Sequence, residues 1–221
     1  MKLLALEFSS PQRGVAVLHD GPNARPTALG EAIEVGGRST NTLGLVAEAL
    51  RQAQLEREQI ECLAIGLGPG SYTGIRLAIA FAQGWQLARP VQLLGISSAE
   101  CLAAEAQAEG IFGNVQVVID AQRNEFYLAG YELTAQSRRE IEPLRLVAAA
   151  EVQVRQQAGG IVIGPEATRW FPGSRVLFPR ATTLGQMARE RHDFVPGEKL
   201  EPIYLRETTF VKAPPPRSVP L

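Results

Sequence analysis

The sequence has few of the residues on which metal and redox sites depend. It contains two histidines, His19 and His192, and neither has a second ligand at metal-binding spacing. Its two cysteines, Cys62 and Cys101, form no Cys-x-x-Cys pair, which favours two reduced, buried thiols over a single disulfide. We therefore expect no metal site.

The sequence also lacks an excess of either charge and any long apolar run. Its 221 residues carry 22 Lys plus Arg and 23 Asp plus Glu, so the net charge is −1. A nearly neutral chain has no broad basic surface to hold nucleic acid by charge alone, so a partner would have to supply most of that contact. No apolar segment reaches the roughly 20 residues of a membrane span, and we see no signal peptide. We expect a cytoplasmic globular protein.

What the sequence does contain is one pattern of elements used twice. Each half begins with a meander of short strands and continues with alternating helices and strands, which predicts two related α/β lobes. In the first half, strands are expected at 2–10, 13–21, 26–35, 60–67 and 90–96, and helices at 42–58, 74–89 and 97–110. In the second half, strands are expected within 114–133 and at 141–149, 160–165 and 176–178, and helices at 149–159 and 182–193. We expect an N-terminal lobe at 1–110, a C-terminal lobe at 111–211 and a Pro-rich, disordered tail at 212–221.

Two carboxylates, Glu7 and Asp120, end the first strand of each half. Facing each other across a cleft, they could hold a divalent ion for phosphoryl transfer, and Ser9 and Ser10 could touch phosphates. The plainer alternatives are that the serines form a tight hairpin, and that Asp120 caps a turn and pairs with Arg123. The turn after Asp120 has no glycine to wrap around a phosphate, so we expect poor ATP turnover. No cofactor is assigned, and weak binding of ATP or ADP stays open.

Residues 66–76 read GLGPGSYTGIR, a glycine-rich turn between an apolar strand and a helix. No lysine follows, so the turn is not a P-loop, and the glycine spacing does not fit the dinucleotide fingerprint. We expect Gly70 to take a positive φ, and Ser71 or Thr73 to cap the helix. Free amides there could bind an anion, or the glycines could let two backbones approach closely. The residues of this signature turn are Gly68, Pro69, Gly70, Ser71, Tyr72, Thr73, Gly74 and Arg76.

The helix expected at 74–89 is apolar on more than one side. Ile75, Ile79 and Trp85 are interspersed with small residues such as Ala78 and Ala82, which allow close helix packing. Such a helix is either a fully buried crossover helix or one that docks on another subunit.

Several segments resemble the TsaB (YeaZ) family of proteins in tRNA threonylcarbamoyladenosine synthesis, in order from residue 3 to about 206. They read LLALEFSS, RGVAVL, CLAIGLGPGSYTGIRLAIAFAQGWQLA, LLGISSAECLA, VVIDAQRNEFYLAGY and EPIYLR. GPGSYTGIR and the D-A-x-x-x-E-x-Y pattern at 120–127 are the most specific of these matches. The resemblance implies a two-lobed, actin-like ATPase fold with a ribonuclease-H-like sheet in each lobe.

The resemblance also implies a role as a partner. In the family, this subunit is not the catalyst; it pairs with and activates a larger paralogue, TsaD, which threonylcarbamoylates N6 of the tRNA adenosine beside the anticodon. The ATPase TsaE joins the pair, tRNA is met through the complex, and the subunit can also form a homodimer. Docking uses two helices that correspond here to 43–57 and 74–89. The interface residues expected on them are Leu43, Val46, Leu50, Ile75, Ala78, Ile79, Ala82 and Trp85.

Three departures from related patterns favour an accessory subunit over an enzyme. The family usually has Asp at the position of Glu7, and a His–Ser or His–Thr pair where this chain has Arg38-Ser39. The His-x-x-x-His metal motif of the paralogue is absent. We therefore assign no catalytic residue. The alternatives are a stand-alone ATP-dependent kinase of the same fold and a peptidase with Ser71 as nucleophile.

Overall fold

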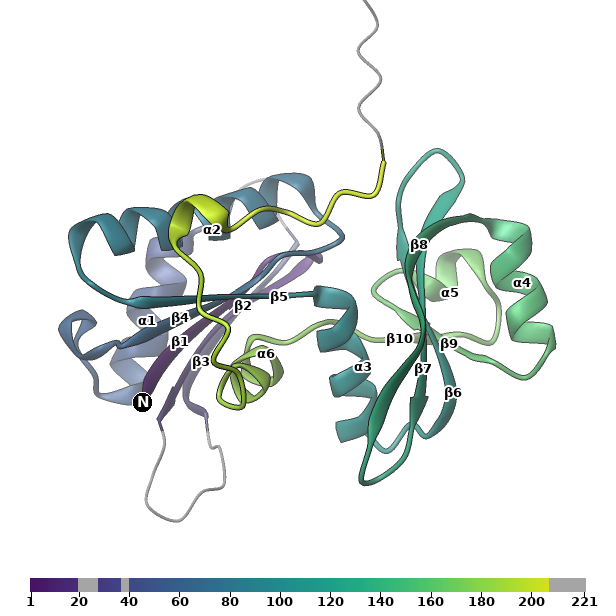
Figure 1. The fold of residues 1–221 in the computed structure, drawn as a ribbon, viewed down its shortest axis with the longest axis horizontal. Coiled ribbons are helices and arrows are strands. Elements are labelled where there is room, and N and C mark those ends of the chain that lie inside the picture. Colours follow the sequence, from purple (N-terminus) through teal and green to yellow (C-terminus); the bar gives the residue numbers. More distant parts are fainter. Residues whose placement is uncertain (20–27, 37–39, 207–221) are drawn as a thin grey trace, which may run out of the picture.

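The computed structural model describes residues 1–19, 28–36 and 40–206, which form two five-stranded mixed sheets (Figure 1). The first sheet has the order β3-β2-β1-β4-β5 and the second the order β8-β7-β6-β9-β10. The strands are β1 (Lys2–Glu7), β2 (Gln12–His19), β3 (Ala28–Val35), β4 (Cys62–Gly66), β5 (Gln92–Ile96), β6 (Gly113–Asp120), β7 (Glu125–Leu133), β8 (Arg138–Ala148), β9 (Ile161–Gly164) and β10 (Arg175–Val176).

The two sheets share one topology. In each, the first three strands form an antiparallel meander, and the fourth and fifth strands run parallel to the first. The pattern read from the sequence is therefore confirmed: the two halves are related α/β units.

Helices cover both faces of each sheet, so the molecule has five layers (Figure 1). The helices are α1 (Thr42–Ala53), α2 (Tyr72–Ala88), α3 (Ser98–Ala108), α4 (Ala149–Gln157), α5 (Ala167–Trp170) and α6 (Ala181–Ala188), and the 3-10 turns are η1 (Arg57–Gln59) and η2 (Gly197–Lys199). Helices α1 and α2 lie on the outer face of the first sheet, α3 and α6 lie between the sheets, and α4 and α5 cover the far face of the second sheet. One apolar core fills each of the four spaces between the layers. Both cysteines are free and buried, as expected.

Some helix ends differ from the sequence prediction. Helix α1 stops at Ala53 instead of continuing to 58, because Gln54 adopts the left-handed conformation with φ 54° and ends the helical hydrogen bonding. Its cap is Asn41, whose Oδ1 accepts from the Gly44 amide at 3.0 Å. Helix α6 likewise ends at Ala188, five residues earlier than expected.

The C-terminal part of the described chain returns to the first sheet. Helix α6 packs on β1 and β2, the Val195 amide donates to the Leu93 carbonyl, and the Ile203 amide donates to the Leu67 carbonyl. The division into lobes at residue 110 stays a prediction, because α6 from beyond it packs on the first sheet and α3 from before it packs on the second. The Pro-rich tail and the Arg38-Ser39 pair lie outside the described residues. None of the helices in the described ranges is long and apolar enough to cross a membrane.

Candidate functional site

The signature turn packs directly against the loop after β1. The Ser71 amide donates to the Ser9 carbonyl at 2.7 Å. A Cβ on Gly70 would lie 2.1 Å from that same carbonyl oxygen, and a Cβ on Gly74 would lie 2.1 Å from the Phe8 oxygen. The glycines thus permit a close approach of two backbones, which is one of the two readings that the sequence left open.

The local conformation of this turn agrees with the sequence prediction. Gly70 has a φ of 145°. The Ser71 hydroxyl oxygen caps α2 by accepting from the Gly74 amide at 3.3 Å. Helix α2 starts at Tyr72, two residues before the expected position, because this cap satisfies an amide of the first turn.

Two exposed aromatic rings extend the turn toward the C-terminal segment. The Tyr72 and Tyr204 rings stack with centroids 5.6 Å apart, and the Arg76 Cζ lies 3.8 Å above the Tyr72 ring. Arg206 then donates to the Ala121 carbonyl at 3.1 Å, in the β6–β7 turn of the second sheet. Sequence reasoning missed the contact of Tyr204, although the EPIYLR segment that contains it was part of the resemblance.

Glu7 is fully buried and does not line the cleft that contains Asp120, so the prediction that the two carboxylates face each other across it is wrong. Its side chain is fully buried on the side of β1 that faces α3. One carboxyl oxygen accepts from the Ser9 amide at 2.8 Å, and the other accepts from the Ser98 hydroxyl at 2.8 Å. That hydroxyl oxygen also accepts from the Gly68 amide at 3.1 Å. Burial raises the pKa of Glu7, and the hydrogen bonds from Ser9 and Ser98 offset only part of that shift.

Asp120 does line a cleft between the two sheets, with a volume of about 500 Å³. Its Oδ1 accepts from the Gln122 amide at 2.7 Å, so it caps the following turn. Three successive residues of that turn, Gln122, Arg123 and Asn124, have positive φ angles of 62°, 56° and 61°. This turn is therefore held in a tight shape by the Asp120 cap and Arg206, and it offers no glycine amides to a phosphate.

The rest of the cleft is polar but contains few side chains that could act in catalysis. Ser9 and Ser10 line it, and the Ser10 hydroxyl donates to the Gln12 carbonyl at 2.8 Å, as in the tight-hairpin reading. Arg13 also lines it, and its Nε and Nη1 are buried without an acceptor in the described part of the chain, so an anion is the ligand that this side chain could attract. Neither a lysine nor a histidine is among the lining residues. Across the described residues, no three His, Cys, Asp or Glu side chains come together as a metal site would require.

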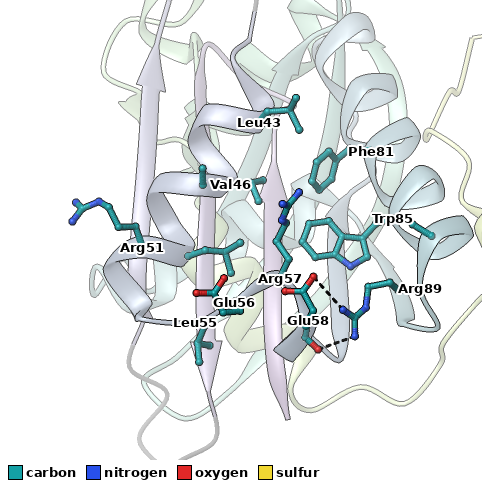
Figure 2. Close-up of a pocket in the computed structure, with 13 residues that line it drawn as sticks. Leu43, Val46, Arg51, Leu55, Glu56, Arg57, Glu58, Phe81, Trp85 and Arg89 are labelled. Carbon is teal, nitrogen blue, oxygen red and sulfur yellow. Dashed lines mark hydrogen bonds and ion pairs between the residues drawn. The ribbon is translucent and has the colours of Figure 1, made fainter.

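A larger groove, of about 790 Å³, lies between α1 and α2 (Figure 2). Leu43 of α1 is 73% exposed at its edge, and Phe81 and Trp85 of α2 form a tilted ring pair with centroids 5.4 Å apart. Phe81 was missed, although its i, i+4 spacing from Trp85 marks a second apolar face of α2. The groove is an open apolar surface between two helices of the outer layer.

Four of the eight expected interface residues do not line this groove. Ile75, Ala78, Ile79 and Ala82 have the i, i+3, i+4, i+7 spacing of one helix face, and that face packs on the first sheet. Val46 and Leu50 do line the groove, but only 3% and 5% of their surfaces are exposed. Leu43 and Trp85 are the two members that the structure places at the groove with accessible surface. Docking through these two helices stays a prediction. The surface that they expose contains Leu43, Phe81 and Trp85 and not the Ala78 side of α2.

Charged residues close one end of the groove. The side chains at this end are those of Glu56, Arg57, Glu58 and Arg89 (Figure 2). Arg51 extends outward from α1 and pairs with Glu48. Arg89 donates to the Glu58 carbonyl at 3.0 Å and forms an ion pair with the Glu58 carboxylate at 3.4 Å. The groove is therefore apolar along its length and charged where η1 crosses it.

Comparisons with known proteins agree with one another. The family model "TsaD: tRNA N6-adenosine threonylcarbamoyltransferase" matches residues 38–195. Among curated relatives, "tRNA threonylcarbamoyladenosine biosynthesis protein TsaB" of Haemophilus influenzae is 28% identical over 97% of this chain and 98% of its own length. The Escherichia coli protein of the same name is 27% identical over 97% of this chain and 99% of its own.

Solved structures give the same result. YeaZ from Pseudomonas aeruginosa superposes with a TM-score of 0.76 at 28% identity, covering 92% of this chain and 99% of its own. A second Pseudomonas aeruginosa structure, of an uncharacterized protein with similarity to peptidase YEAZ, has a TM-score of 0.77 at 29% identity and covers 93% of this chain and 99% of its own. Together with the two related mixed sheets, these matches confirm the predicted two-lobed, actin-like fold.

Proposed function

Because the chain belongs to the TsaB (YeaZ) family, within the wider group that the TsaD family model describes, we propose that it is an accessory subunit in the threonylcarbamoylation of tRNA adenosine. Its role is to dock on and activate the TsaD paralogue, which carries out the transfer to the adenosine beside the anticodon. TsaE joins this pair, and the complex works in the cytoplasm. The other subunits supply most of the contacts to tRNA, because a chain with a net charge of −1 does not hold nucleic acid by charge alone.

The groove between α1 and α2 is the observation that carries this proposal. Its apolar walls face solvent, and the ring pair of Phe81 and Trp85 with the exposed Leu43 gives it the character of a docking surface. Covering such a surface is favourable by roughly 25 cal/mol per Å² of apolar area removed from water. The same groove is where the free chain would self-associate.

A stand-alone kinase is less well supported by the cleft. Phosphoryl transfer needs carboxylates that hold a metal ion close to the phosphates. Glu7 is buried outside the cleft, which leaves Asp120 and Glu166 as its lining carboxylates, and one oxygen of Asp120 already accepts from the Gln122 amide. Among the described residues, these two do not join a third ligand to form a metal site. Weak binding of ATP or ADP remains compatible with Arg13, but we propose no turnover.

A peptidase with Ser71 as nucleophile is also less well supported. The Ser71 hydroxyl oxygen accepts from the Gly74 amide as a helix cap. Neither histidine lines the cleft, so no base lies beside this serine there. The residues that the two enzyme alternatives require, Glu7, Asp120 and Ser71, are thus engaged in hydrogen bonds that stabilise the fold.

The proposal is tested by association with the TsaD protein of the same organism. We expect the purified chains to form a complex in sedimentation velocity, and Leu43→Arg to weaken it by at least about tenfold, because it places a charge on an apolar contact surface. Leu43 is exposed in the free chain, so this variant should fold normally. Val176→Arg, at a 47% exposed position of the second sheet, is the matched control and should bind within about twofold of wild type. An absence of complex formation, or a Leu43→Arg variant that binds normally, would show that the docking proposal is wrong.

A second measurement addresses the kinase alternative. ATP turnover by the isolated chain should stay at background and should not change in Asp120→Ala. Turnover that this substitution abolishes would favour the enzyme over the accessory subunit.

A further inference from the structure

The groove between α1 and α2 contains one cation with no partner in the described part of the chain. Figure 2 shows Arg57 rising from η1 into the groove, between Val46 of α1 and Trp85 of α2. Its side chain makes no hydrogen bond or ion pair with any described residue, whereas Arg89 pairs with Glu58. A guanidinium group is thus presented on an otherwise apolar surface.

The groove wall adds a second donor without an acceptor. Trp85 Nε1 is buried, and among the described residues it has no hydrogen-bond partner. Indole N–H is a donor only, and guanidinium is a donor only. Trp85 Nε1 is already buried in the free chain, so a partner changes its surroundings little, whereas Arg57 is exposed. A partner that covers Arg57 and leaves its guanidinium unpaired would lose much of what it gains from apolar contact.

We propose that the groove takes a partner helix carrying a carboxylate, and that Arg57 selects that helix by binding the carboxylate. This inference rests on the proposed docking function and names the chemistry of its contact. A carboxylate matches the planar guanidinium with two parallel hydrogen bonds, which adds geometric selectivity to the charge attraction. The apolar face of the same helix covers Leu43 and the Phe81–Trp85 ring pair.

A second copy of this chain fits the same requirement less well. Its own groove offers two carboxylates at the charged end, Glu56 and Glu58. Glu58 is already held by Arg89, which leaves Glu56. In Figure 2 the Glu56 carboxylate lies on the α1 side of the groove. The self-associated form would therefore depend on Glu56, and the hetero-complex would not.

The test compares binding of the whole chain to the TsaD protein of its organism by calorimetry, at about 50 and 300 mM NaCl. We expect Arg57→Glu to weaken binding by at least about tenfold at low salt and by less at high salt, because salt screens the repulsion between the two carboxylates, whereas binding of the wild type should weaken as salt rises. Arg57→Lys should fall between them, because an ammonium group keeps the charge but not the paired geometry. Arg175→Glu, at an exposed arginine of β10, makes the same charge change on the other sheet and should bind within about twofold of wild type.

The outcomes separate this inference from the function on which it rests. If Leu43→Arg abolishes binding and Arg57→Glu does not weaken it, the docking function stands and the carboxylate inference is wrong. If wild type does not bind at all, both are wrong. If Arg57→Glu and Glu56→Gln each break up a homodimer while TsaD binding is unchanged, a second copy is the occupant and the inference is overturned.

Discussion

Glu7→Gln replaces a buried ionisable group with a neutral one of the same size. Glu7 is fully buried with no cation among the groups that shift its pKa, and desolvation is the largest cause of its raised pKa. The amide oxygen of glutamine can still accept from the Ser9 amide, and its NH₂ group can donate to the Ser98 hydroxyl oxygen. The substitution therefore keeps the packing and removes the cost of a buried charge.

The sign of the pH dependence follows from the raised pKa. The ordinary value is 4.5 and the folded value is higher, so the folded chain binds a proton that the unfolded chain has released. The favourable contribution of neutral Glu7 is fully present below about pH 4.5 and is lost as the pH rises to the folded pKa. Within that window the wild type loses about 1.4 kcal/mol of unfolding free energy per pH unit relative to Glu7→Gln, and above it the difference is constant.

Urea unfolding of both proteins between about pH 4 and pH 8 measures this difference. We expect the free energy of unfolding of Glu7→Gln to increase relative to that of wild type as the pH rises. Glu7→Ala is the control: it should lie about 2–4 kcal/mol below Glu7→Gln at every pH, because both lack the ionisable group but the alanine leaves a cavity and a buried Ser9 amide without an acceptor. A difference between Glu7→Gln and wild type that does not change with pH would refute the reasoning, because it would mean that the carboxyl group is charged at no extra cost.

Three further predictions concern the fold. Ala78→Arg combined with Ala82→Arg should unfold the chain, as measured by circular dichroism, because both side chains are completely buried against the first sheet. Gly70→Ala should lower the free energy of unfolding by about 2–4 kcal/mol in urea titration, because its φ is 145° and its Cβ would meet a backbone oxygen at 2.1 Å. Burial raises the pKa of Cys62 to about 12 and that of Cys101 well above its ordinary value, so neither thiol should react with a disulfide reagent at about pH 8 until the chain is unfolded.

The order of elements and the family could be predicted from the sequence because they depend on local patterns. The apolar run at 60–67 contains β4, whose five residues are all buried, and this is what a central strand covered on both faces requires. The glycines, serine and apolar residues of GLGPGSYTGIR similarly determine a strand end, a tight turn and a capped helix. Helix ends were less predictable, because a left-handed residue such as Gln54 carries no strong sequence signal.

The tertiary structure decided which of these residues reach solvent. Helix α2 is apolar on two sides, and periodicity alone does not say which side faces the sheet; the sheet takes the side of Ala78 and leaves Phe81 and Trp85 at the groove. Glu7 and Asp120 end equivalent strands, but Glu7 shares a face of β1 with Leu3 and Ala5, and that face is covered by the middle layer of helices. Successive side chains of a strand point to opposite faces of the sheet. Whether a given side chain is buried therefore depends on which layer another part of the chain places on its face. The sequence by itself thus determined the elements and the family, and long-range packing decided that the accessible surface is a groove between two helices.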